Sequence, residues 1–508
     1  MSPQNSMDLS DARTRCPSAA SRKRVLDMTF PSTARNEVDA RALRAPRCIP
    51  GPLPRRGLGW RGNVLHFLRD PVSVLTQMQR QYGEVVAFAR GYEHWVAGFG
   101  PRANRAILTN ANAYHVDPIP APIPERSALS RLKRSIAFVD GDVHRRQRVL
   151  LIPAFRKECL EIHQRAVVEV AERVLSTWKA GERLNISQVM HDLTLQIILR
   201  ALVGRIGAEH AAIGAQLARW QRMIADPRVL LLPVAFPGLP FWRLENLSLS
   251  IEKTIVALIT AARSSEEAGN DILSLMSASL GDRSPNEEGW AADEITANVM
   301  LLMLAGHETS SNVLTWTLFL LSQHPRLVDD LREEVWSVLR GSPPSFEDAR
   351  RLALLERAVS ESMRILPPLV YNTRRVVEAV ELCGYELAPG TKIVWSPYVT
   401  HHMPELYDEP EEFRPDRWCS NGPKADTYLP FGLGPHGCIG GHFASMSVTT
   451  ILAMILQRTA LVMADGAVID RKVKLTLTPS QGMPMIVADR AKKVPVRGNI
   501  HEMVRLGA

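Results

Sequence analysis

The chain has 508 residues, of which 45% are hydrophobic and 22% are charged, and its net charge is +8. This composition is typical of globular proteins, and it argues against a transmembrane anchor because no run approaches the ~20 consecutive apolar residues that span a bilayer. The basic residues are spread along the chain without interleaved aromatic residues, so we expect no nucleic-acid binding.

The cysteines show no CxxC spacing or other paired spacing; they are Cys16, Cys48, Cys159, Cys383, Cys419 and Cys438. Such scatter argues against a disulfide framework and against a zinc site. We therefore expect a reducing, cytoplasmic environment for this protein.

Residues 1–47 lack apolar periodicity and are rich in Ser, Arg and Asp, which is typical of a flexible tail. They contain no apolar core of a secretory signal peptide, and their aspartates count against an organelle transit peptide. A proline-rich segment at 48–54 then leads into the folded domain, which we expect to span 48–508.

The first predicted elements lie between residues 70 and 125. Residues 70–82 predict a helix with Asp70 as N-cap and Pro71 in its first turn. Residues 84–99 predict a β-hairpin that turns at Arg90 and Gly91. Four prolines at 118–125 predict a loop.

A basic helix is predicted to begin at Gly141, and its His144 and Arg148 share one face because they are four residues apart. On the residues alone, this is also the pattern of a solvated basic helix. Helical patterns then dominate to about residue 365, with interruptions near 204–207, 236–240 and 281–285.

One of these helices, predicted at 293–323, is long and apolar but carries the polar run Ala305-Gly306-His307-Glu308-Thr309-Ser310. A glycine inside a helix costs about 1 kcal/mol relative to alanine, and buried polar residues need partners or a task. The run fits a helix kinked for packing, in which Thr309 bonds back to the carbonyl four residues earlier. It equally fits a catalytic helix.

Two further motifs carry charged residues. Glu361 and Arg364 lie three residues apart on a helix that ends at a Pro-Pro pair, and an exposed pair of this kind contributes only ~0.2–0.5 kcal/mol. Arg374 and Arg375 follow that stop, and Arg417 lies in the run Phe413-Arg414-Pro415-Asp416-Arg417-Trp418. Short strands are predicted at 373–377, 391–394, 472–478 and 484–487.

The last motif is Phe431-Gly432-Leu433-Gly434-Pro435-His436-Gly437-Cys438-Ile439-Gly440, followed by a predicted helix at 441–457. A lone cysteine is usually a small buried hydrophobe, but a packed cysteine does not need four surrounding glycines. A thiolate at a helix N-terminus is stabilised by the helix dipole, and glycines let the backbone approach a flat macrocycle. Cys438 is therefore a candidate axial ligand for haem iron.

Taken in order, these motifs resemble those of the cytochrome P450 family, and the resemblance covers the chain except for its N-terminal tail. Phe431, Gly434, Cys438 and Gly440 match the family's haem-binding loop, FxxGxRxCxG. His436 stands where the family usually has an arginine that pairs with a haem propionate. A protonated imidazole makes the same contact, and a neutral imidazole makes a weaker one.

The resemblance assigns roles around haem b (iron protoporphyrin IX). Cys438 would bind the iron, and thiolate ligation favours O–O cleavage. On the other side, Gly306 would leave room for dioxygen, the Thr309 hydroxyl would donate to the bound oxygen, and Glu308 would relay protons.

The resemblance also implies contacts that hold the haem and its loop. His144, Arg148 and one of Arg374 and Arg375 would contact the propionates. A buried set would fix the core around the cysteine loop without taking part in chemistry: Glu361, Arg364 and Arg417. Breaking one member of this set should cost several kcal/mol, because it leaves a buried charge unpaired.

The fold implied is mainly α (α-rich α+β), with small β-sheets and the haem between the long helix and the cysteine loop. We expect a bacterial, monomeric monooxygenase of secondary metabolism that hydroxylates or epoxidises a medium-sized apolar organic substrate with dioxygen. The chain has no flavin or nicotinamide GxGxxG fingerprint and no iron–sulfur spacing. Its two electrons would therefore come from a ferredoxin or flavodoxin and its reductase.

Two alternatives remain open on the sequence. A peroxide-using or rearranging haem-thiolate enzyme has the same loop, but such enzymes often lack the acid–alcohol pair that Glu308 and Thr309 supply. A non-catalytic haem-binding sensor is the alternative from another functional class.

Overall fold

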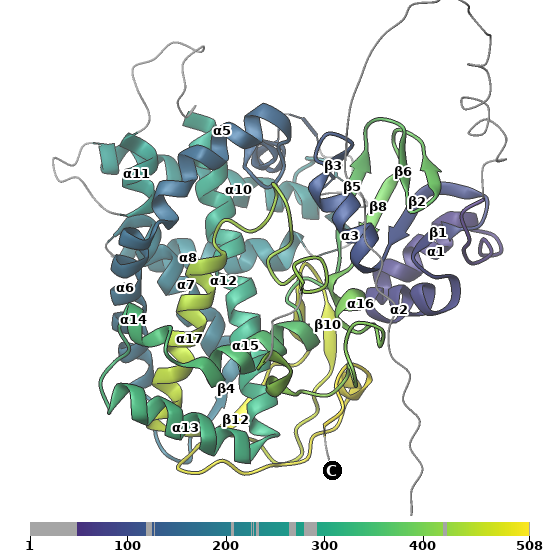
Figure 1. Cartoon of the computed structure of the whole chain (residues 1–508). Helices are drawn as coiled ribbons and strands as arrows, with labels where there is room; N and C mark the ends of the chain where they lie inside the picture. The colour runs from purple at the N-terminus through teal and green to yellow at the C-terminus, as the bar shows by residue number, and fades with distance from the viewer. Residues whose placement is uncertain are drawn as a thin grey trace, which may run out of the picture. The chain divides into compact units, whose positions relative to one another are not determined.

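The computed structural model describes residues 48–117, 124–125, 127–204, 208–224, 226, 228–229, 233–263, 271–278, 292–419 and 424–506 (Figure 1). The tail predicted at 1–47, most of the loop predicted at 118–125 and the interruption at 281–285 lie outside these residues. The expected domain boundary at residue 48 therefore stays a prediction.

Helices make up most of the described chain, which confirms the predicted mainly α class. The α-helices are α1 Gly59–Arg69, α2 Pro71–Tyr82, α3 Gly100–Thr109, α4 Ala128–Arg131, α5 Gly141–Leu151, α6 Lys157–Leu175, α7 Ile186–Val203, α8 Ala208–Ile224, α10 Pro240–Arg263, α11 Ile272–Ala278, α12 Ala292–Ser322, α13 Pro325–Leu339, α14 Phe346–Ala349, α15 Ala353–Ile365, α16 Pro397–His401 and α17 Gly441–Arg458. Short 3-10 helices are η1 Leu132–Arg134, η2 Ile152–Phe155, η3 Pro415–Trp418 and η4 Asn499–Glu502.

The strands form small sheets beside the helices. They are β1 Val85–Ala89, β2 Tyr92–Gly98, β3 Tyr114–Val116, β4 Arg183–Asn185, β5 Asn372–Val376, β6 Val380–Leu382, β7 Tyr385–Leu387, β8 Lys392–Trp395, β9 Ala460–Met463, β10 Arg471–Val473, β11 Leu477–Pro479 and β12 Pro484–Ala488. The largest sheet has the order β1-β2-β8-β5-β3, and β2 and β8 are its parallel pair. A second sheet has the order β4-β12-β9, and β6–β7 and β10–β11 are hairpins.

Several predicted elements form for the predicted local reasons. Pro71 opens α2, and the Asp70 carboxylate accepts the Ser73 N–H at 3.4 Å as its cap. The hairpin β1–β2 turns at Arg90 and Gly91, the latter with a φ of +80°. The long helix α12 and the helix α17 after the cysteine loop lie where the sequence places them.

The strand predicted at 472–478 is wrong in one respect, because this segment is the hairpin β10–β11. Arg471 pairs with Pro479, and Lys474 N–H bonds to the Thr476 carbonyl at the turn. Leu475 at the tip is apolar although it is exposed. It continues the alternation of polar and apolar residues, so the sequence pattern does not indicate a turn. The short strands β3, β4, β6, β7 and β9 were not predicted.

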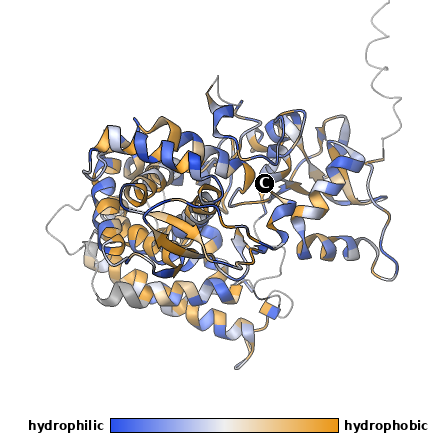
Figure 2. Cartoon of the chain, turned by 90° about the horizontal axis from the view of Figure 1, so that it is seen from below, coloured by the Kyte–Doolittle hydropathy of each residue, from blue (hydrophilic) through white to orange (hydrophobic). Residues whose placement is uncertain are grey.

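The core lies between the helices, and its closest packing joins α7 to α12. A side-chain carbon on Gly306 would lie 2.8 Å from the Ile198 side chain, so this glycine lets α7 approach α12. Figure 2 shows hydrophobic residues along the central helices and strands. Within the described residues, no helix is long and apolar enough to cross a membrane.

Candidate functional site

The cysteine loop is a tight turn in front of α17. The Cys438 N–H bonds to the Phe431 carbonyl at 2.8 Å, and the Gly437 N–H bonds to the Gly434 carbonyl at 3.0 Å. Gly434 has a φ of +73°, and a side-chain carbon there would lie 2.1 Å from the Leu108 carbonyl oxygen. Only glycine therefore allows the loop to lie against the end of α3.

The Cys438 side chain is accessible to solvent, although many protein atoms lie close around it. Burial raises the pKa of the Cys438 thiol, against the opposing effects of the Gly440 N–H and the Arg148 charge. Among the described residues, no group of three or more His, Cys, Asp and Glu side chains could hold a metal ion.

A cluster of titratable residues adjoins this loop. The His436 ring stacks on the His144 ring at 3.9 Å between centroids, and His436 Nε2 lies 3.2 Å from Asp140 Oδ1. Burial and the nearby positive charges lower the pKa of His144 to about 4. Burial alone would raise the pKa of Asp140, but the contacts with His436 and with the Val116 N–H outweigh burial and lower it.

Asp140 was missed by the sequence analysis, although it directly precedes the helix start at Gly141. Its presence changes the interpretation of His436. In this structure the His436 ring faces a carboxylate of the protein itself, where the resemblance implies a haem propionate.

The structure distinguishes Arg374 from Arg375 by their burial. Arg374 is buried on β5, whereas Arg375 on the opposite face of the strand is exposed. Burial lowers the pKa of Arg374 to about 10, and the Asp140 charge partly opposes this shift. Arg148 Nη1 donates to the Gly437 carbonyl at 2.8 Å, so it supports the cysteine loop directly.

These residues fit a haem. The Arg374 guanidinium is buried, and its hydrogen bond goes to the carbonyl of its own neighbour Thr373 at 3.1 Å. A buried positive charge with only one carbonyl partner needs an anion nearby. The Asp140 carboxylate does not meet this need alone, because it also faces His436. The two propionates of a haem would supply that charge beside the accessible Cys438 thiol.

The Glu361 carboxylate on α15 is fully buried. Arg364 makes two hydrogen bonds to Glu361, both at 2.9 Å, and Arg417 Nε makes one at 2.8 Å. Burial alone would raise the pKa of Glu361, but the two arginines outweigh it and lower that pKa. The sequence missed Trp418, whose Nε1–H donates to Glu361 Oε2 at 2.9 Å.

The residues of the polar run on α12 make different contacts. The Thr309 hydroxyl donates to the Ala305 carbonyl at 2.8 Å, which is the backbone contact that the packing interpretation predicts. Gly306 faces Ile198, so its lack of a side chain serves packing against α7. The exposed residue beside Thr309 is Ala305, and this small side chain leaves room there.

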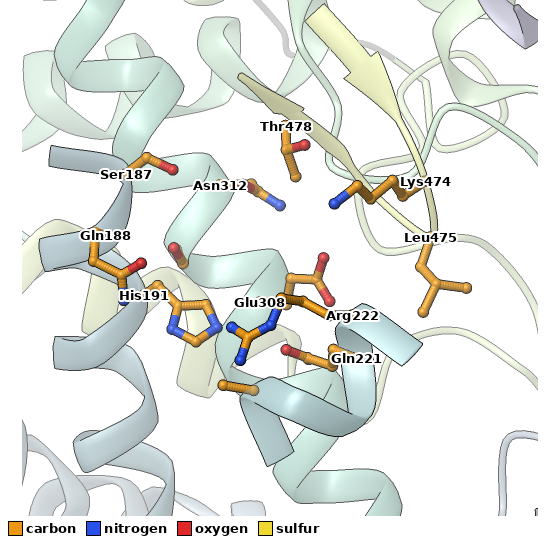
Figure 3. A pocket seen from close by; sticks show the side chains of 12 residues that line it. Ser187, Gln188, His191, Gln221, Arg222, Glu308, Asn312, Lys474, Leu475 and Thr478 are labelled. Atoms are coloured by element: carbon orange, nitrogen blue, oxygen red, sulfur yellow. The ribbon is translucent and has the colours of Figure 1, made fainter. Parts of the chain in front are cut away.

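Glu308 points into a polar cavity of about 200 Å³ between α7, α8, α12 and the β10–β11 hairpin (Figure 3). Its Oε1 accepts the Thr476 hydroxyl at 2.7 Å, and Asn312 donates to the same hydroxyl at 3.0 Å. The cavity is lined by Ser187, Gln188, His191, Ala218, Gln221, Arg222, Glu308, Ser311, Asn312, Lys474, Leu475 and Thr478. None of these contacts joins Glu308 or Thr309 to the cysteine loop.

Comparisons with known proteins identify the family of this chain. The family model of cytochrome P450 matches residues 52–484. Cyclooctatin synthase of Streptomyces melanosporofaciens is 32% identical and covers 83% of this chain and 92% of its own. Pentalenene oxygenase of Streptomyces avermitilis is 29% identical, with shares of 80% and 90%.

The fold has solved counterparts at lower identity. The retinoic acid-bound cyanobacterial CYP120A1 has a TM-score of 0.74 at 22% identity, covering 87% of this chain and 99% of its own. The haem domain of cytochrome P450DA has a TM-score of 0.75 at 23% identity, with shares of 88% and 98%.

Proposed function

This chain belongs to the cytochrome P450 family, a monooxygenase family with a haem iron, and we propose that it oxygenates a medium-sized apolar molecule. The cofactor would be haem b, and the two electrons would come from a ferredoxin or flavodoxin with its reductase. The observation that carries the proposal is an accessible cysteine thiol on a glycine loop at the start of α17, together with a buried arginine, Arg374, whose charge acts on Asp140, the partner of His436 in that loop. The predicted cytoplasmic location, monomeric state and catalytic domain at 48–508 belong to the same proposal.

The names of two relatives support the substrate class. Pentalenene oxygenase is named for an alkene, and cyclooctat-9-en-7-ol 5-monooxygenase, which is 26% identical, for an alkenol. Both are molecules with few polar atoms. We infer hydroxylation or epoxidation of such a molecule.

Bound haem supplies dioxygen activation at a thiolate-ligated iron. The protein's residues supply the rest. Cys438 would hold the iron and would be deprotonated there, because a thiolate is the ligand form. Arg374 would neutralise a propionate, and Arg148 would hold the loop through the Gly437 carbonyl.

Proton supply would fall to α12. Glu308 is half-buried in a polar cavity, where it can take a proton from solvent. Thr309 can turn its hydroxyl from the Ala305 carbonyl toward a bound ligand. This acid–alcohol pair favours a dioxygen-using enzyme over a peroxide-using or rearranging one.

A first test uses the purified holoprotein. The reduced carbon monoxide complex should show the Soret band typical of thiolate ligation, and an apolar alkene such as pentalenene should shift the spin state of the iron. With a surrogate ferredoxin and reductase, the product should gain one oxygen atom from dioxygen. A Soret band typical of histidine ligation would contradict the proposal. So would turnover with peroxide combined with no turnover with dioxygen and electrons.

Replacing Glu308 with Gln should lower product formation by about 10²-fold, because a positioned acid contributes on this scale. Reducing equivalents should then appear as hydrogen peroxide, and the solvent isotope effect should rise. The substrate-binding spectrum should stay unchanged. Asp330→Asn, on the exposed side of α13, is the control. An unchanged ratio of product to hydrogen peroxide in Glu308→Gln would reject the proton-supply role.

Arg374→Gln should weaken haem binding by about 10- to 100-fold, since hydrogen bonds to charged groups contribute ~1.5–3 kcal/mol. Arg375→Gln is the matched control, because Arg375 lies on the exposed face of the same strand. The rate of haem transfer to apomyoglobin measures the difference. Equal rates for the two variants would remove Arg374 from the haem site.

A further inference from the structure

A second surface of interest lies on α1 and on the turn that leads into it, outside the site described above. Leu53, Leu58, Leu65 and Leu68 have exposed fractions of 71%, 59%, 54% and 46%. Positions 58, 61, 65 and 68 follow the spacing of one helical face. This face, termed the α1 face, thus exposes several large apolar side chains together, whereas single ones are normal on protein surfaces.

The exposure of these leucines is not a result of fraying. Arg55 and Gly59 exchange backbone hydrogen bonds at 3.2 and 2.8 Å, which closes the turn before the helix. The buried Asn63 amide donates to the Leu53 carbonyl at 3.1 Å and to the Phe88 carbonyl on β1 at 2.7 Å. Figure 1 shows α1 beside β1 and β2. The leucines are therefore presented outward on an anchored backbone.

The charge of this surface has one sign. No acidic residue occurs from 48 to 69. A basic rim of exposed arginines borders the α1 face, and within the described part of the chain none of them forms an ion pair: Arg55, Arg56, Arg61, Arg69 and Arg90. Of the acids that adjoin this segment, Asp70 pairs with Arg471 at 3.0 Å, and Glu93 on β2 accepts the Ile49 N–H at 3.1 Å.

Aromatic residues border the same surface. The Arg90 N–H bonds to the Pro52 carbonyl at 2.8 Å, which holds the β1–β2 turn and its exposed Tyr92 beside the α1 lead-in. Trp60 is half-buried at the start of α1, and the Arg61 guanidinium lies 5.1 Å from its ring centroid. Tyrosine and tryptophan are the side chains enriched where proteins meet lipid headgroups.

We propose that the α1 face binds the surface of an anionic lipid membrane. Leucines on one side of a short helix, flanked by arginines without neutralising partners, are what an interfacial helix needs. The leucines would enter the headgroup region, and the arginines would contact lipid phosphates. A purely acidic protein or a nucleic acid would use the arginines but would leave the leucines without a partner. The proposal does not depend on the chemistry at Cys438.

The test uses the full-length holoprotein and sedimentation with vesicles. Vesicles of phosphatidylcholine with phosphatidylglycerol should bind the protein, and pure phosphatidylcholine vesicles should bind it weakly. Arg61→Gln with Arg69→Gln should weaken binding by about 10- to 30-fold, and salt should weaken the parent in the same way. Leu65→Ser with Leu68→Ser should weaken binding by about tenfold or more. Leu249→Ser with Val256→Ser, exposed apolar positions on α10, should bind as the parent does.

Two results would overturn the proposal. Vesicle binding that survives both double variants would place the contact elsewhere, for example in residues 1–47. Binding that depends on the arginines but not on the leucines would indicate an electrostatic partner such as an acidic protein. Turnover with electrons from soluble partners should stay the same in all variants, so a failure of membrane binding is distinguishable from a failure of the proposed catalytic function.

Discussion

Cys438→Ser is expected to abolish oxygenation, with a loss of roughly a thousandfold or more in product formation. A serine hydroxyl does not donate electron density to iron as a thiolate does, and it holds a proton far more strongly. The carbon monoxide complex of any haem retained should lose the spectrum of thiolate ligation. Product analysis and reduced difference spectra on the same preparation measure both effects.

Cys419→Ser is the matched control, because Cys419 is also exposed and lies outside the glycine loop, near Arg357. It should leave spectrum and turnover unchanged. A Cys438→Ser protein with an intact thiolate-type spectrum would show that another residue binds the iron, and the assignment of the glycine loop would fall with it.

Glu361→Gln is expected to lower the free energy of unfolding by about 3–5 kcal/mol, because Arg364 stays buried without an anionic partner. The remaining contacts of Arg364 go to carbonyl oxygens, at His401, Pro410 and Glu412. These dipoles do not neutralise a guanidinium. Denaturant unfolding of the holoprotein, followed by circular dichroism and by the Soret band, measures the loss.

Asp408→Asn provides the comparison within the same region. Asp408 pairs with Arg414 at 3.0 Å, but its side chain is 81% exposed, so removing this charge should cost at most about 1 kcal/mol. Equal losses in the two variants would mean that the Glu361 set does not act as a buried charge network.

The lowered pKa of Glu361 gives this stability difference a pH dependence. A carboxyl with a lower pKa in the folded state stabilises the protein above its ordinary pKa, and this contribution is lost as the pH falls toward the folded-state value. The gap between parent and Glu361→Gln should therefore narrow below about pH 4. A gap that stays constant down to acid unfolding would contradict this origin.

The helices and the motif residues could be predicted from the sequence because their signals are local. The cap at Asp70, the apolar length of α12 and the glycines around Cys438 each lie within a few residues of what they determine. The sheets were harder, since β4 has three residues and owes its existence to β12, far along the chain. No local pattern specifies such a partner.

The same limit applies to the site. Arg374 and Arg375 are equivalent in the sequence, and only the pairing of β5 with its neighbours decides which one is buried. Asp140 and Trp418 take part through contacts with His436 and Glu361, which are far away in the chain. Gly306 could be recognised as unusual in a helix, but its neighbour Ile198 comes from α7.

The Glu308 carboxylate is oriented by a hydroxyl that comes 168 residues later, on the β10–β11 hairpin. Glu308 and the hairpin residue that orients it can therefore change independently in evolution. The tip of the hairpin is open to solvent at Leu475, so this position can vary, whereas Thr476 and Leu477 are buried against α12. Under the proton-supply role proposed for Glu308, exchanging the tip of this hairpin between relatives would alter proton supply while α12 itself stays the same.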